Sequence, residues 1–583
     1  MSNNETNTLQ YAVDEPPPHW LSALLGFQVV ALILSGIVLV PLIALNAAGM
    51  SEDAKNWAVF GALLVSGSVT ILQARPLGPV GAGYVLFMGT SGAFIAVSIS
   101  AMNAGGLALL ASLIIASSLV QFLFAQHLGL LRKIITPTVG GTVVALIAVA
   151  VIPISLDMLK QLPDQYAGTA GAPAWAAAMT LGVTLGLSFF GSKKWRLWGP
   201  VIGVISGSVL AHGLGLTDLS AVAAAPLIGL PTLAWPGLDL SFGPAFWVLL
   251  PGFIIVTLIG ALETYGDGIA IQEVSRRGRQ PTDFKVVQGA VNADGLGNLL
   301  SGLIGTLPNT TYSTSVSVAD LTGVAARRVG VYGGLFLMLL AFSPKVSAIL
   351  QAIPGPVAGA FIFFLIVLLF AHGIKLIVSD GLSFDNGIVF GVSFWMGYGF
   401  QAQAVFHDLL SPALSELLDN GMTTGGITAV LLSLLLNAKK SKAYAITVPA
   451  KATSLPELMT FARARASAAD WRGGDIARLE LALEEAFLYQ VEQAGTQSGA
   501  AFKVRLSLRT RGAQLEAEFV SAPASENMLT VIDRMDPVTD FSTEDLRLRL
   551  LVGMVDEVFH EQFNQHDYLS LLISQKRSLD RLQ

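Results

Sequence analysis

The stretch FWVLLPGFIIVTLIGALETYGDGIAI, residues 246–271, is long and apolar enough to cross a bilayer, yet it contains two acidic residues. A membrane-spanning helix needs about 20 apolar residues. A charge at the middle of the bilayer costs at least about 2.5–3.5 kcal/mol, so such residues usually line a site or a pathway. Glu263 and Asp267 are four residues apart and share one helix face. With Asp294 in the next apolar stretch, they predict a polar, protonatable centre near the middle of the membrane.

The composition predicts a polytopic α-helical membrane protein. Of the 583 residues, 53% are hydrophobic and only 13% are charged, and charge is sparse as far as about Lys439. The expected membrane segments are 21–46, 56–73, 82–102, 107–131, 136–156, 174–192, 198–217, 244–272, 284–306, 309–323, 330–350, 355–373, 385–403 and 421–437. These are about fourteen spans in a transporter domain of residues 20–440, after a tail of residues 1–19.

Two of these segments, 82–102 and 309–323, are broken by Gly, Pro and polar residues, and each is the third of seven in its half of the chain. This arrangement is typical of transporters built from two inverted repeats (7+7). We expect each broken segment to hold a short extended strand followed by a half-helix. The N-terminal end of such a half-helix would aim backbone N–H groups at a bound ligand.

The loop charges predict the orientation. With the N-terminus inside, the external loops receive only Lys55, Lys160 and Lys345, while the internal loops receive the other basic residues up to Lys442. The positive-inside rule then places both termini in the cytoplasm. We expect the protein to lie in the inner membrane of the cell. A net charge of −6 gives no indication of nucleic-acid binding, and we expect no cofactor, no metal and no enzymatic activity.

Three motifs resemble one family. NADGLGN at 292–298, GTLPNTTYS at 305–313 and LTGVAARRVG at 321–330 are similar to sequences of the nucleobase–ascorbate transporters, the xanthine/uracil permeases. The resemblance covers roughly residues 20–437. It implies a core domain and a gate domain, alternating access, proton-coupled symport of a purine or pyrimidine base, and a possible homodimer.

The resemblance also implies roles for individual residues. Glu263 would hydrogen-bond the base, Phe94 would stack beside it, and Asp267 and Asp294 would support proton coupling. Each has a plainer alternative: a hydrogen bond to a neighbouring helix for Glu263 and Asp267, capping or bridging of the broken segment for Asp294, and packing for the aromatic ring.

The family signature is altered in the second broken segment. Where the family has Gln or Glu, then Asn, then Gly, this chain has Thr314, Ser315 and Ser317. We predict that Thr314 and Ser315 contribute to the substrate site, although their hydroxyls could instead satisfy freed backbone groups. The altered signature leaves the exact substrate open. Two other functions also stay open: a facilitative anion or small-metabolite carrier, and a membrane sensor that signals through the C-terminal domain.

Residues 441–583 predict a separate cytoplasmic α/β sandwich. A strand is expected at 443–448, a capping box at Ser454 and Glu457, an amphipathic helix from Asp475, and two further strands near 502–510 and 514–520. A helix near 544–557 and a strand near 568–574 would complete the domain.

This domain resembles the histidine-kinase-like ATPases, and most nearly the anti-sigma-factor kinases. Tyr489 stands at the position of the family's magnesium-binding Asn. SAPA at 521–524 and STEDLR at 542–547 stand where glycine-containing motifs would be. Side chains there would obstruct a phosphate. We therefore expect a pseudo-ATPase that contacts a cytoplasmic regulatory partner.

Overall fold

The structure is a computed structural model that describes residues 9–125, 136–160, 171–277, 283–379, 381, 383–402, 418, 421–439, 443–495, 503–511, 514–521, 550–563 and 566–575. The chain forms two compact units. The first, here called the helical unit, comprises most of the chain up to Ser433; the second, called the α/β unit, consists mainly of Leu434–Gln583.

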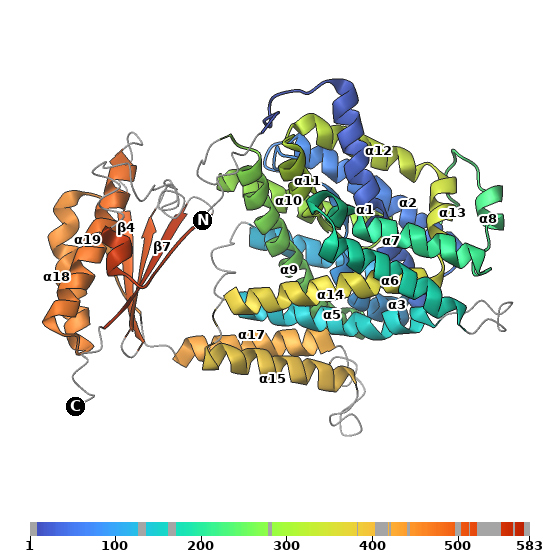
Figure 1. The fold of residues 1–583 in the computed structure, drawn as a ribbon. Helices are drawn as coiled ribbons and strands as arrows, with labels where there is room; N and C mark the ends of the chain where they lie inside the picture. The colour runs from blue at the N-terminus through green and yellow to red at the C-terminus, as the bar shows by residue number, and fades with distance from the viewer. Residues whose placement is uncertain are drawn as a thin grey trace. The chain divides into compact units, whose positions relative to one another are not determined.

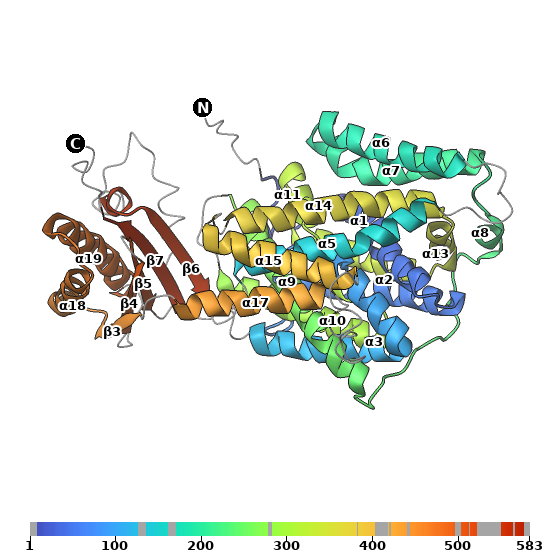
Figure 2. The same cartoon turned by 90° about the horizontal axis from the view of Figure 1, so that it is seen from below.

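The helical unit contains helices at the predicted positions (Figures 1 and 2). They are α1 (His19–Ala47), α2 (Glu52–Ala74), α3 (Ile95–Ala125), α5 (Pro137–Leu159), α6 (Ala172–Phe190), α7 (Lys193–Gly213), α8 (Ser220–Ala224), α9 (Pro244–Val274), α10 (Phe284–Ile304), α11 (Thr314–Thr322), α12 (Arg327–Ala341), α13 (Pro344–Gln351), α14 (Gly355–Ser379), α15 (Phe384–Gln401) and α17 (Gly421–Lys439). Within the described residues, seven helices are long and apolar enough to cross a membrane, or up to eight if α12 and α13, bent by 83°, form one span. The chain therefore has the helices of a multi-pass membrane protein, and fourteen crossings stay a prediction.

The segments predicted at 82–102 and 107–131 meet in α3, which is kinked between them. Gly105 and Gly106 have non-helical backbone angles, and Gly106 has a φ of 73°. A side chain at that φ would be strained, so glycine allows the break.

The two broken segments form the expected short strands. β1 (Met88–Thr90) pairs antiparallel with β2 (Asn309–Thr311), with Gly89 opposite Thr310. Each strand leads into a helix: β1 into the 3₁₀ turn η1 (Gly92–Phe94) and α3, and β2 into α11. Because the strands pair with each other, they satisfy backbone groups that water cannot reach.

Helices from the two halves of the chain pack closely through glycines. A Cβ on Gly67 of α2 would lie 2.6 Å from the Gly334 carbonyl oxygen of α12. A Cβ on Gly141 of α5 would lie 2.4 Å from the Gly373 carbonyl oxygen of α14. Such small-residue contacts let membrane helices approach, and α5 and α14 lie side by side in both views (Figures 1 and 2).

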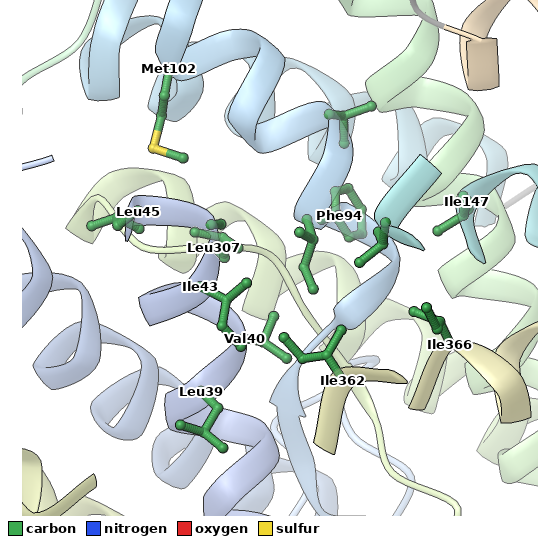
Figure 3. Close-up of a cluster of buried hydrophobic side chains, with 14 of the residues drawn as sticks. Leu39, Val40, Ile43, Leu45, Phe94, Met102, Ile147, Leu307, Ile362 and Ile366 are labelled. Carbon is green, nitrogen blue, oxygen red and sulfur yellow. The ribbon is translucent and has the colours of Figure 1, made fainter. Parts of the chain in front are cut away.

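A buried apolar cluster lies beside the strands. It includes Val40 of α1, Phe94 of η1, Ile147 of α5 and Ile362 of α14 (Figure 3). These side chains come from both halves of the chain, so the cluster holds the start of α3 between them.

The N-terminal segment runs along the turn between α11 and α12. Tyr11 forms a parallel bridge with Val324. Glu15 accepts two hydrogen bonds from Arg277, at 2.6 Å each. The Ala12 N–H, which donates to the same carboxylate, and the Arg277 guanidinium lower the pKa of Glu15 from its usual value.

The α/β unit is a two-layer sandwich. Its sheet has the order β3 (Tyr444–Pro449), β4 (Lys503–Arg511), β5 (Gln514–Ser521), β7 (His566–Ser574), β6 (Glu557–Phe563), and every neighbouring pair is antiparallel. Helices α18 (Leu455–Ala468) and α19 (Gly473–Gly495) lie on one face (Figure 1). The predicted apolar stripe of α19 faces the core, where Leu479, Leu483 and Phe487 are fully buried.

Two local predictions in this unit need correction. The helix predicted near 544–557 is present over residues 550–554, but it ends before Glu557, which begins strand β6. Ser454 does precede α18, but it ends the 3₁₀ turn η4 (Ala452–Ser454) in a helical conformation and makes no side-chain cap hydrogen bond. An N-cap needs non-helical backbone to aim its oxygen at the first amides. The motif at 542–547 and most of 521–524 lie outside the described residues, so the ATPase resemblance and the loss of nucleotide binding stay predictions.

Candidate functional site

Helix α9 carries Glu263 and Asp267 past the two strands. It packs against α3, α11 and β2. A Cβ on Gly260 would lie 3.9 Å from the Thr310 hydroxyl of β2, so the helix approaches the strand at this level. The predicted pair of acids is therefore next to both broken segments.

Asp267 connects α9 to the end of β2 and to the link between β2 and α11. Thr311 donates a hydrogen bond to Oδ2 at 2.6 Å, and Ser313 donates one to Oδ1 at 2.7 Å. The side chain is 7% exposed. The Thr264 hydroxyl lies 3.2 Å from that of Thr311 and extends this polar group along α9. Both carboxyl oxygens are thus occupied by protein donors.

Glu263 has the opposite environment. Its carboxyl makes no hydrogen bond or ion pair with any residue that the structure describes. The side chain is exposed although many protein atoms lie around it. A Cβ on Gly92, at the start of η1, or on Gly266 of α9 would meet no atom within 4 Å. Of the three acids, Glu263 is the one that is exposed.

Asp294 of α10 is fully buried, at 0% exposure. Gln121 of α3 donates to its Oδ2 at 2.7 Å, and the Gln121 oxygen accepts from Asn298 at 3.0 Å. Asn298 in turn accepts from the backbone N–H of Asn309 in β2, at 2.8 Å. Glu263 lies near enough to Asp267 and Asp294 to interact electrostatically with both. The structure therefore brings the three predicted acids into one region.

The other predicted site residues lie around the same two segments. Phe94 is 1% exposed, with its ring centroid 6.3 Å from that of Phe253, inside the cluster of Figure 3. Ser315 is buried, where its hydroxyl donates to the Tyr312 carbonyl and accepts from the Phe87 N–H. Thr314, at the start of α11, is partly exposed. Phe94 and Ser315 thus support the backbone of the site, whereas Thr314 is accessible.

Several residues of this region were not predicted individually. The Tyr312 hydroxyl donates to the Thr90 carbonyl at 2.8 Å and so links the second broken segment to the first. A Cβ on Gly89 would lie 2.7 Å from its ring, which explains a glycine there. Gln121, Asn298 and Asn309 were also missed as a group, although amides in apolar segments were a visible signal. Among the described residues, no group of three or more acids, His or Cys is placed to hold a metal ion.

Comparison with known proteins agrees with the resemblance seen in the motifs. The sequence model of the xanthine/uracil permeases, described as "Permease family", matches residues 22–406. The protein named "Putative purine permease CPE0397" of Clostridium perfringens is 30% identical over 75% of this chain and 94% of its own length. Xanthine permease XanP of Escherichia coli is 29% identical over 76% of this chain and 97% of its own length.

Among solved structures, the transmembrane domain of the cyanobacterial bicarbonate transporter BicA covers 73% of this chain and is itself covered completely. Its TM-score is 0.44 and its identity is 16%, too low to support a conclusion about this chain. The sequence match is decisive: the chain belongs to the xanthine/uracil permease family, whose members are membrane transporters and not enzymes.

Proposed function

We propose that this protein is a secondary active transporter that takes up a purine base of the xanthine class together with protons. The similar proteins named purine and xanthine permeases support this substrate class. The observation that carries the proposal is the carboxyl group of Glu263, which is accessible and has no hydrogen-bond partner in the described protein.

An oxopurine offers ring N–H donors and carbonyl acceptors on neighbouring edges. In the proposed complex, the N–H groups donate to Glu263. The carbonyl groups accept from backbone N–H groups at the starts of η1 and α11, where the positive ends of helix dipoles favour oxygen atoms. Thr314 adds a hydroxyl at the accessible start of α11. Phe94 and Ser315 hold the surrounding backbone in place, and Phe94 does so from inside the buried apolar cluster.

Proton coupling is assigned to Asp267 and Asp294. A buried carboxylate is costly unless it is well bonded, so protonation and substrate binding can influence each other. Asp267 is suited to this because it joins α9 to the end of β2 and to the link that follows it. Neutralising it weakens two charge-assisted hydrogen bonds and loosens that connection.

The wider architecture is part of the same proposal. It comprises fourteen crossings as two inverted repeats, core and gate domains that alternate access, a possible homodimer, and both termini on the cytoplasmic side of the inner membrane. The domains are residues 1–19, 20–440 and 441–583, the last a pseudo-ATPase that contacts a regulatory partner. The close glycine contacts between helices of opposite halves are consistent with it.

Uptake of labelled xanthine into proteoliposomes tests the function. With one proton per substrate, a gradient of one pH unit supplies about 1.4 kcal/mol and about tenfold accumulation. Accumulation that a protonophore abolishes supports the proposal. Flux that is independent of the proton gradient would favour a facilitative carrier, and binding without uptake would favour a sensor.

A further inference from the structure

A continuous chain of buried side chains joins Asp294 to strand β2. It runs from Asp294 of α10 to Gln121 of α3, back to Asn298 of α10, and then to the backbone of Asn309 in β2. None of these residues is more than 3% exposed. Gly295 makes room for the chain, because a Cβ there would lie 3.2 Å from the ring of Phe122 and 3.5 Å from Gln121.

The Asn309 N–H at one end of this series of side chains determines which group donates and which accepts in every hydrogen bond of the series. The Asn309 N–H can only donate, so Asn298 must present its oxygen to it and its NH₂ group to Gln121. Gln121 must then accept with its oxygen and donate with its own NH₂ group to Asp294. Oδ2 of Asp294 is therefore obliged to accept. A proton on this carboxyl therefore favours Oδ1, which meets no donor or acceptor at full hydrogen-bond geometry among the described residues, although the Thr264 hydroxyl lies beside the carboxyl.

We propose that Gln121 and Asn298 are positioning residues that form an amide relay between Asp294 and β2, so that a charge on Asp294 holds the strand more firmly than a neutral carboxyl does. The proposal rests on the proposed transport function only in giving Asp294 a proton to carry. Hydrogen bonds to an ionised acceptor are shorter and roughly twice as strong as neutral ones. Chains of amides polarise one another, so this difference reaches the Asn309 N–H.

The groups around Asp294 include other acids and neutral hydrogen-bonding side chains. From α9, Glu263 and Asp267 act on this region as further acids, and the Thr264 hydroxyl lies beside the carboxyl. The relay itself contributes only neutral groups from α3, α10 and β2. Among the described basic groups, His372 of α14 acts on Asp267, and Lys375 acts on His372.

The test replaces Gln121 by glutamate and Asp294 by asparagine, singly and together. Gln121→Glu places a second carboxyl against Asp294 Oδ2, and two carboxyls can share this contact only while one of them holds a proton. Asp294→Asn alone keeps the relay, because the oxygen of the new amide still accepts from Gln121. The double variant also restores every bond, since the introduced amide on α10 and Asn298 both donate to the introduced carboxylate on α3. The readout is the thermal unfolding midpoint of the purified full-length protein between pH 5 and pH 9, without substrate.

The relay predicts that Gln121→Glu lowers the midpoint by at least about 2 °C at pH 9 and by much less at pH 5. The proton that the two neighbouring carboxyls share is bound at low pH and is lost as the pH rises. Asp294→Asn added to this variant should return the midpoint to within about 1 °C of the Asp294→Asn single variant at every pH. A loss in Gln121→Glu that is independent of pH, or one that the double variant does not recover, would overturn the relay.

Xanthine uptake by the same variants adds the functional readout. The relay predicts a raised KM in Gln121→Glu at pH 8 and a KM near that of Asp294→Asn in the double variant. An unchanged KM in Gln121→Glu would overturn the link to β2. Absence of xanthine uptake by the wild type would contradict the proposed function instead, and the unfolding measurements would still decide the relay.

Discussion

Replacing Glu263 with glutamine keeps the shape of the side chain and removes its charge. The carboxyl has no hydrogen-bond partner in the described protein, so no internal contact is lost and the effect should fall on the ligand. A hydrogen bond to a charged group contributes about 1.5–3 kcal/mol, against about 0.5–1.5 kcal/mol for a neutral pair. With one or two ring N–H groups bound, the loss is about 1–3 kcal/mol, which corresponds to about a 5- to 150-fold weaker Kd for xanthine.

Calorimetric titration of the purified protein with xanthine measures this change. Glu273→Gln is the matched control, because Glu273 is an exposed acid ten residues further along the same helix. We expect the control to bind like the wild type. A Glu263→Gln variant that folds normally and binds xanthine within twofold of the wild type would refute the assignment of Glu263 to the ligand.

Three further predictions concern the elements around the site. Asp267→Asn should still exchange xanthine across the membrane but should accumulate much less of it under a proton gradient; equal gradient-driven accumulation would exclude Asp267 from coupling. Gly67→Val should lower the free energy of unfolding by about 1–3 kcal/mol or more, because its Cβ would lie 2.6 Å from a carbonyl oxygen of α12. The thermal unfolding midpoint measures this loss. The lowered pKa of Glu15 means that its hydrogen bonds from the Ala12 N–H and from Arg277 stabilise the fold above the unfolded-state pKa of about 4.5, and this stability is lost as the pH falls through the folded-state value. The midpoint difference between wild type and Glu15→Gln should therefore be largest at neutral pH and vanish in acid; a difference that grows in acid would contradict this pairing.

Local sequence patterns predicted most of the helical unit because membrane segments depend on short-range composition. The apolar stretch around Glu263 became α9, and the glycine- and threonine-rich stretch before Thr314 became β2 and α11. The approach of the three acids also followed from their positions in neighbouring segments. These features need no knowledge of distant contacts.

Roles that depend on distant partners could not be read from the sequence. Ser315 looked like a ligand residue, yet its hydroxyl is bonded to the Tyr312 carbonyl and to the Phe87 N–H, more than 200 residues away in the chain. Gln121 and Asn298 are 177 residues apart, and only the packing of α3 on α10 reveals the relay. Glu557 begins an edge strand whose pairing with β7 overrides the helical pattern before it.

The position of bound xanthine in an experimental structure of the wild-type protein tests the central claim most directly. The proposed site predicts a ring within about 3.2 Å of a Glu263 carboxyl oxygen, between the start of η1 and the start of α11. A xanthine bound elsewhere, with Glu263 directed away from it, would rule out this site.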